Sequence, residues 1–243
     1  MPTKVAVCQV PDIREDIEGS LGWIEKFTWQ AEADGVSIIC FPECFLQGYL
    51  SEKRLAKKYA INFISSTFKR ILKQLANCKP AIVFGLIEKD DKNLFNTAVV
   101  IKEGEMMGRY RKTHLLRGEQ VFKAGSEYPV FEINGLRFGI NICYDTQFPE
   151  SAAKLARQGA KLILCPANNM MRYETAEKYK HLHHEMRIER VNETRVWLMS
   201  ADVTGKREDR IAYGPTSVIN PGGKVVAQVP LMKTGMLVAE INS

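Results

Sequence analysis

Residues 35–44 read GVSIICFPEC, and this stretch decides the fold class. The run 36–41 is apolar and rich in β-branched residues, which predicts a buried strand that Pro42 ends. Ahead of it, apolar residues recur at helical spacing over 17–31, and residues 4–10 alternate as a strand does. A strand, a helix and a second strand in this order predict an α/β protein.

Strand-like and helix-like segments continue to alternate along the chain. Asn134-Gly135 between two apolar runs is a strong hairpin signal. Early strand–helix units followed by late hairpins favour an α/β/β/α layering, and the periodicity also fits a three-layer sheet. We expect a short helix capped by Ser51, helices near 68–75, 149–158 and 175–193, and strands at 81–87, 96–101, 106–110, 131–133, 136–143, 161–164, 196–200, 212–219, 225–229 and 236–241.

The composition is that of a globular protein. Of the 243 residues 45% are hydrophobic and 26% are charged, which excludes disordered, collagen-like and coiled-coil classes. We see no linker, composition break or internal repeat, so we expect a single domain over residues 1–243. The net charge of +6 is spread along the chain, which argues against a nucleic-acid partner.

Export and membrane insertion are not expected either. The N-terminal residues lack a charged region followed by an apolar run of about 7–15 residues, and no window approaches about 18 apolar residues. The six cysteines lie far apart, without C-x-x-C spacing. We therefore expect free thiols, a cytoplasmic location and no membrane contact.

Three polar residues stand at or just beyond the ends of apolar, strand-like runs. They are Glu43, Lys112 and Cys143. The carboxyl ends of strands are where an α/β sheet forms its ligand crevice. A thiol attacks a carbonyl carbon as the thiolate, a nearby carboxylate can take its proton, and an ammonium can stabilise the developing oxyanion. The three residue types therefore make a chemically sensible set.

The sequence around these residues resembles the three signatures of the nitrilase, or carbon–nitrogen hydrolase, superfamily. The similarity also covers the start of the chain, residues 5–9, and a late segment, residues 213–222. One such motif is weak, but three in the right order are a specific signal. The motifs are Phe41-Pro-Glu-Cys44, Tyr110-Arg-Lys-Thr-His-Leu115 and Cys143-Tyr-Asp-Thr-Gln-Phe-Pro-Glu150.

The resemblance implies a four-layer αββα sandwich and a Glu-Lys-Cys site that needs no metal or organic cofactor. Glu43 would be the general base, Cys143 the nucleophile and Lys112 the oxyanion stabiliser. Glu119 matches a second glutamate that holds the lysine and lines the site, and the backbone N–H of Tyr144 would complete the oxyanion hole. Cys143 would form a thioester with the acyl group, which water activated by Glu43 then hydrolyses.

The implied substrate is a small linear amide, either a carboxamide or an N-carbamoyl amine. An amidase is favoured over a nitrile hydrolase because the chain ends at Ser243 without the extension of spiral-forming nitrilases. Gln147 stands where many small amidases of the family carry an arginine, so the acyl preference is open. The residues expected to line the pocket are Tyr49, Tyr144, Asn168, Asn169 and Met170.

The resemblance also implies a homodimer or a higher even oligomer, and a C-terminal strand segment free to reach a neighbour would serve such contacts. Other interpretations compete with the enzyme. His181 and Glu185 stand one helical turn apart, but the segment lacks the H-E-x-x-H pattern and we expect no metal. Cys143 could pair with a histidine instead of Glu43, either His114 or one of His181, His183 and His184. A non-catalytic scaffold and a thiol redox sensor are the remaining alternatives.

Overall fold

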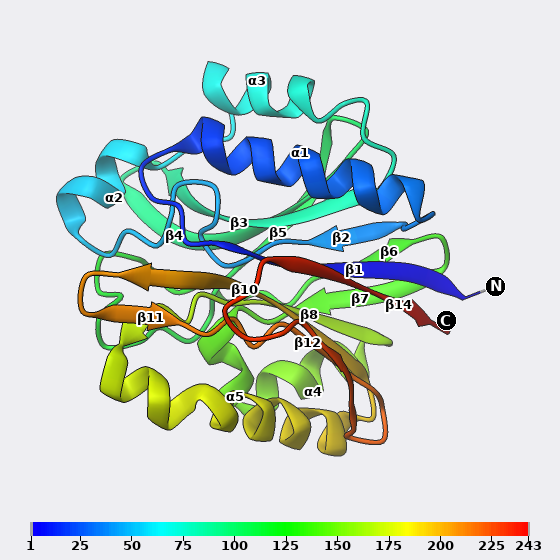
Figure 1. Cartoon of the computed structure of the whole chain (residues 1–243). Coiled ribbons are helices and arrows are strands. Elements are labelled where there is room, and N and C mark those ends of the chain that lie inside the picture. The colour runs from blue at the N-terminus through cyan, green and yellow to red at the C-terminus, as the bar shows by residue number, and fades with distance from the viewer. Residues whose placement is uncertain (1, 243) are drawn as a thin grey trace.

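The expected alternation of strands and helices is present in the computed structural model, which describes residues 2–242 (Figure 1). No helix among these residues is long and apolar enough to cross a membrane. The elements in chain order are β1 (Thr3–Pro11), α1 (Ile17–Ala33), β2 (Ile38–Cys40), α2 (Lys53–Tyr59), α3 (Ser66–Gln74), β3 (Ala81–Asp90), β4 (Asn93–Lys102), β5 (Glu105–Arg111), β6 (Val130–Ile133), β7 (Leu136–Ile140), the 3-10 helix η1 (Cys143–Gln147), α4 (Pro149–Arg157), β8 (Leu162–Pro166), β9 (Met171–Arg172), α5 (Tyr173–Thr194), β10 (Trp197–Arg207), β11 (Arg210–Ala212), β12 (Ser217–Ile219), β13 (Val225–Gln228) and β14 (Gly235–Ile241).

The strands form two leaves that join at one seam. The first leaf runs β5-β4-β3-β2-β1 and the second runs β10-β8-β7-β6. They meet where the ends of β1 and β10 pair in parallel, with Gln9 opposite Asp202. Helices α1 and α3 cover the first leaf, and α4 and α5 cover the second (Figure 1). This arrangement confirms the four-layer αββα sandwich.

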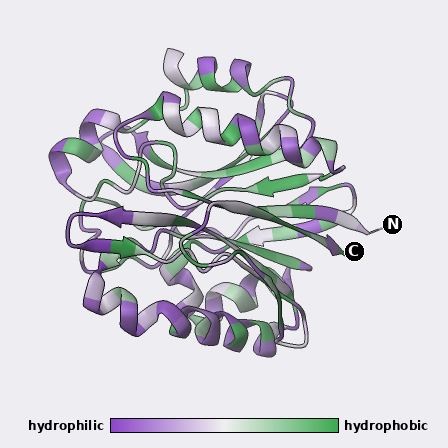
Figure 2. Ribbon diagram, in the orientation of Figure 1, coloured by the Kyte–Doolittle hydropathy of each residue, from purple (hydrophilic) through white to green (hydrophobic). Residues whose placement is uncertain are grey.

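Three apolar layers separate these four layers. Strand β1 shows why, because its residues alternate between two cores. Val5 and Val7 pack between the leaves with Phe138 of β7. Ala6 and Cys8 face the opposite way, into the core beneath α1. A strand buried on both faces needs a nearly continuous apolar run, which is what the sequence shows and what Figure 2 displays on the inner strands.

Some expected elements differ from the structure. The strand expected at 212–219 is two strands, β11 and β12, since residues 213–216 leave the ladder around Gly214, whose φ is +72°. Ser51 is not a helix cap, because α2 begins after Glu52. The C-terminal strand β14 is not a loose segment, because it pairs with β1 from Thr3 to Gln9.

One close approach in the first leaf fixes the loop after β2. Gly85 of β3 donates its N–H to Pro42 O at 3.0 Å and accepts from Leu46 N at 3.0 Å. A Cβ placed on Gly85 would lie 2.2 Å from Cys44 N and 2.7 Å from the carbonyl carbon of Glu43. Only glycine therefore allows this loop to lie so close to the strand.

We predict that Gly85→Ala lowers the free energy of unfolding by about 1–3 kcal/mol, because the new methyl group meets rigid backbone atoms. Gly22→Ala is the matched control. Position 22 lies in α1 with no atom within 4 Å of an added Cβ, so this change should raise the free energy of unfolding by about 0.5–1 kcal/mol. Denaturant titration of both variants measures the difference, and equal stabilities would contradict the close approach.

Candidate active site

A buried lysine lies between two carboxylates where the two leaves meet. Lys112 Nζ is 2.7 Å from Glu43 Oε1 and 2.9 Å from Glu119 Oε1. The three side chains are at most 1% exposed. Glu43 follows β2, and Lys112 follows β5 directly. The structure thus brings together three of the four side chains that are predicted from the sequence to have catalytic roles.

Further groups complete the hydrogen bonding of the two carboxylates. Asn96 Nδ2 lies 2.7 Å from Glu43 Oε1 and 3.1 Å from Glu119 Oε1. The second oxygen of Glu43 accepts from Asn168 N at 3.0 Å, and that of Glu119 accepts from Leu116 N at 2.7 Å. Asn96 was not predicted from the sequence as a site residue. Its only signal there is that a polar residue interrupts the apolar run that forms β4.

Cys143 stands at the start of η1, in the left-handed region with φ +44°. A non-glycine residue held in this region is strained, and such strain concentrates at functional sites. Its Sγ lies 3.9 Å from Asn169 Oδ1. The neighbouring Asn168 contacts Glu43, so the loop after β8 touches both the thiol and the carboxylate.

Asp145 ties the cysteine turn to the lysine segment. Its carboxylate accepts from Ile142 N at 2.9 Å, from His114 N at 2.8 Å and from the Tyr110 hydroxyl at 2.8 Å. The aspartate thus fixes the relative position of the segments that carry Cys143 and Lys112. Asp145 lies in one of the three sequence motifs, but no role was predicted for it.

Asn169 is held in turn by Asp202 of β10. Asn169 donates its backbone N–H to Asp202 Oδ1 at 3.1 Å and its side-chain amide to Asp202 Oδ2. Burial raises the pKa of Asp202 to about 6, although Arg187 and the bonds from Asn169 oppose the shift. The orientation of the amide beside the thiol therefore depends on a buried aspartate that the sequence did not reveal.

The buried charges shift one another's pKa values. Burial raises the pKa of Glu43, although Lys112 opposes the rise. Burial also raises the pKa of the Cys143 thiol, and the charge of Glu43 adds to this. Burial disfavours the ammonium of Lys112, but Glu43, Cys143 and Glu119 together outweigh it and raise its pKa. The lysine therefore stays charged, while Glu43 is brought nearer to neutral pH.

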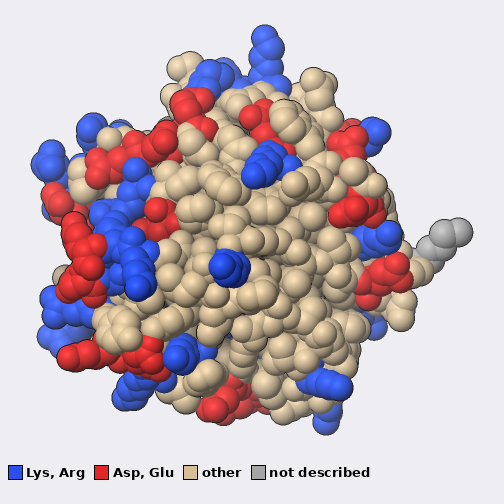
Figure 3. Space-filling view, viewed as in Figure 1, with Lys and Arg blue, Asp and Glu red and all other residues tan. Residues whose placement is uncertain are grey.

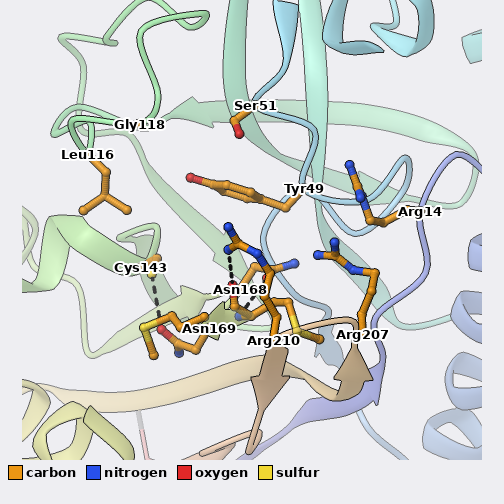
Figure 4. Close-up of a pocket in the computed structure, with 12 residues that line it drawn as sticks. Arg14, Tyr49, Ser51, Leu116, Gly118, Cys143, Asn168, Asn169, Arg207 and Arg210 are labelled. Atoms are coloured by element: carbon orange, nitrogen blue, oxygen red, sulfur yellow. Dashed lines mark hydrogen bonds between the residues drawn. The ribbon is translucent and has the colours of Figure 1, made fainter. Parts of the chain in front are cut away.

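Two cavities meet at Cys143. One, of about 460 Å³, is lined by the predicted pocket residues Tyr49, Asn168, Asn169 and Met170 (Figure 4). The other, of about 360 Å³, is lined by Tyr144 and again by Asn169. Burial raises the pKa of the Tyr49 hydroxyl, and the charges of Glu43 and Glu119 add to the rise. All five residues expected to line the pocket thus border the space next to the thiol.

The histidines have other surroundings. His114 Nδ1 lies 3.2 Å from Asp145 Oδ1, and its ring stacks on Phe148. None of its hydrogen bonds within residues 2–242 goes to Cys143. His183 and His184 of α5 have pKa values lowered to about 3 and about 4, first by burial and then by Arg187. Within residues 2–242, no group of three histidine, cysteine or acidic side chains could hold a metal ion.

The sequence pattern of the carbon-nitrogen hydrolase family matches residues 4–243. The chain belongs to this family. It is 30% identical over 247 residues to a nitrilase of Pyrococcus abyssi, a match that covers 98% of this chain and 89% of the relative.

An omega-amidase of Saccharomyces cerevisiae is 27% identical, with 93% of this chain and 82% of the relative covered. Among solved structures, a Saccharomyces cerevisiae member of branch 10 of the nitrilase superfamily superimposes with a TM-score of 0.85 at 27% identity. That match covers 99% of this chain and 90% of the other. The protein is thus a hydrolytic enzyme of the carbon–nitrogen hydrolase family.

We predict that Glu43→Gln lowers the pKa of the Cys143 thiol, because it removes a nearby negative charge and leaves Lys112 in place. The rate of alkylation by iodoacetamide follows the thiolate fraction, so its pH midpoint should move to lower pH. Cys143 is the only one of the six cysteines that is not buried, which makes the labelling selective.

Glu132→Gln, on exposed β6 surface, is the control and should leave the midpoint unchanged. Cys143→Ala should abolish the fast labelling. An unchanged or higher midpoint in Glu43→Gln would show that the carboxylate does not act on this thiol.

Proposed function

We propose that this enzyme hydrolyses the carbon–nitrogen bond of a small linear amide through a thioester on Cys143. The observation that carries the proposal is the buried Lys112, held between Glu43 and Glu119 beside the one accessible thiol. Nucleophile, base and electrostatic stabiliser are then all side chains of one site. The whole chain, residues 1–243, would act as a single domain.

In the first half-reaction Glu43 takes the thiol proton and Cys143 Sγ attacks the amide carbon. The oxyanion that forms is stabilised by the Lys112 ammonium and the Tyr144 N–H. Glu43 then gives the proton to the departing nitrogen, the carbon–nitrogen bond breaks, and ammonia or an amine leaves the thioester.

In the second half-reaction Glu43 takes a proton from water, whose oxygen attacks the thioester carbonyl. The carbon–sulfur bond breaks, the carboxylic acid leaves, and the proton returns to the thiol. The raised pKa of Glu43 suits a group that accepts and releases a proton in both halves, because proton transfer is most effective near the working pH.

Glu119 and the asparagines have supporting roles in this mechanism. Glu119 and Asn96 fix Lys112 and Glu43, while Asn168 and Asn169 orient the base and the thiol. Tyr49 and Met170 line the cavity that receives part of the substrate. The relative named omega-amidase supports an amide substrate, and the relative named nitrilase makes a nitrile the competing one.

We further propose a cytoplasmic homodimer or a higher even oligomer. The six cysteines are unpaired, which suits a reducing compartment. Over the region of β1 and β14, the face shown in Figure 3 carries few charged side chains. Charged residues are depleted in the cores of protein interfaces, and β14 carries an exposed apolar side chain, Val238.

We predict that an activated ester or hydroxamate substrate adds one acyl mass to the intact protein, and that peptide mapping places this mass on Cys143. Cys143→Ala should remain folded, lose almost all turnover and take up no acyl group. Glu43→Gln should lower turnover at least about 100-fold, the range of a general acid–base group. Ammonia release over carboxamides, N-carbamoyl amines and nitriles identifies the substrate class.

Acylation at Cys44 or Cys165, or full activity of the alanine variant, would contradict the assignment of the nucleophile. A folded protein that releases ammonia from none of the three classes would favour a scaffold instead. Reversible oxidation of Cys143 without any turnover would favour a redox sensor.

We predict a particle of twice 27.5 kDa, about 55 kDa, or an even multiple, in light scattering at micromolar concentration. Val238→Lys should shift the distribution toward the monomer if the β14 face forms the contact, whereas Trp29→Lys, an exposed change on α1, should not. A stable 27.5 kDa particle for the unaltered protein would remove the proposal.

A further inference from the structure

We propose that the 460 Å³ cavity is a carboxylate-binding arm of the active site, so that the substrate is an amide with an anionic end. This inference rests on the proposed amide hydrolysis and specifies its substrate class. Three arginines, Arg14, Arg207 and Arg210, form the arm together with Tyr49 and Ser51. In Figure 4 the guanidinium groups of Arg207 and Arg210 lie below Tyr49 and Arg14 lies to its right, while Cys143 lies on the opposite side of the cavity.

The protein balances the charge of this arm only in part. No carboxylate among the described residues lines the cavity. Of the three arginines, only Arg207 has an ion pair within residues 2–242, in which its Nε lies 3.0 Å from Asp12 Oδ2. Arg210 donates to the backbone carbonyl of Met170 at 3.4 Å. The arm therefore presents an excess of positive charge to the space beside the thiol.

The β10–β11 hairpin places two of these positive charges side by side, which destabilises it. Arg207 and Arg210 are directly opposite in the antiparallel ladder, so their side chains leave the same face. Like charges in this position destabilise a sheet. Arg210 is also opposite Arg172 of β9, which has Asp209 as a partner at 3.5 Å. An anion held by Arg210 and Arg207 would relieve the repulsion.

Arg14 is built into the arm from the opposite side. Its backbone and stem lie against Gly48, where an added Cβ would be 2.8 Å from Arg14 Cγ and 2.5 Å from Ile13 O. Glu15 N donates to Gln47 O at 2.8 Å and fixes this approach. Arg14 Nε is buried without any hydrogen-bond partner among the described residues. The Arg14 guanidinium lines the cavity and has no ion pair among the described residues, so a carboxylate that enters the cavity can pair with it.

The second cavity does not offer a comparable charge. Its arginine, Arg187, already donates to Ser200 Oγ and Pro215 O, each at 2.9 Å, and it faces Asp202 at 4.0 Å. The rest of its lining includes Tyr179, Met186 and a His183 that stays neutral. Of the two cavities that meet at Cys143, the arginine arm is thus the one that selects an anion.

The substrate class follows from this asymmetry. The scissile amide lies at Cys143 and a carboxylate a few bonds away reaches the arginines, as in the monoamide of a short dicarboxylic acid or an N-carbamoyl amino acid. Guanidinium groups bind carboxylates through paired, charge-assisted hydrogen bonds. Amides and N-carbamoyl amines with a cationic end are disfavoured by the same charges.

The first test compares end groups at constant chain length. Succinamate and glutaramate carry the carboxylate, their diamides replace it with a neutral group of the same shape, and 4-aminobutyramide carries a cation. N-carbamoyl-β-alanine and N-carbamoylpropylamine make the same comparison on the amine side. We expect kcat/KM to be at least about 10-fold higher for the anionic member of one series.

The second test removes single arginines. Arg14→Gln and Arg210→Gln should each lower kcat/KM for the preferred anion at least about 10-fold, mainly through KM, and change that for its neutral analogue less than about 3-fold. Arg70→Gln, on α3 with its partner Glu18, is the matched control and should alter neither value. In the Cys143→Ala background, calorimetry should show the same loss for binding of the anion.

The outcomes separate this inference from the proposed function. Equal hydrolysis of the anionic members and their uncharged or cationic analogues within each series, with arginine variants that resemble the control, would overturn the carboxylate arm and leave amide hydrolysis intact. If no amide is hydrolysed, the proposed function fails. Binding of the anions to Cys143→Ala then still decides whether the arm exists, because calorimetry does not depend on turnover.

Discussion

The rest of the structure depends on the burial of Lys112 between Glu43 and Glu119. Removing each of these charges from water costs several kcal/mol, and the mutual attraction offsets this only if the geometry is good and the other lone pairs find donors. The structure meets both conditions, because Asn96, Asn168 N and Leu116 N supply the remaining donors. Two strand ends and two loops must therefore meet within hydrogen-bonding distance. A fold that held them only approximately would leave an uncompensated charge in its interior.

The seam between β1 and β10 makes this meeting possible. Parallel pairing there aligns the carboxyl ends of strands from both leaves, so that Glu43 comes from one leaf and Cys143 from the other. The loop after β8 then connects the leaves directly, since Glu43 N donates to Ala167 O at 3.3 Å and Asn168 N donates to Glu43 Oε2. The apolar layer between the leaves holds them at a fixed separation. The polar contacts fix the position of one leaf relative to the other at the end that carries Glu43.

The sequence could predict the residues whose signal is local. Glu43, Lys112 and Cys143 each stand at or near the end of an apolar run, and continuous apolar strands predicted two-sided burial. Asn96 and Asp202 lie inside strands, and their roles depend on partners far away in the sequence. The arginines of the cavity carry no local signal, because no periodicity shows that Arg14 and Arg210 line the same space. The end of β10 and the break at Gly214 were missed for the same reason, since tertiary packing against Gln9 decides that turn.

The charges of the site also explain why the substrate carboxylate must be bound at a distance from Glu43. With both carboxylates ionised, the buried cluster of Glu43, Glu119 and Lys112 carries one net negative charge. A substrate carboxylate next to it would raise the pKa of Glu43 further, so that a smaller fraction of Glu43 would be ionised and able to accept a proton in the proposed mechanism. The arginine arm avoids this conflict because it holds the anion away from Glu43 and screens its field with opposite charge. The same arginines that select the substrate therefore keep the base usable, so that binding and proton transfer depend on one distribution of charge.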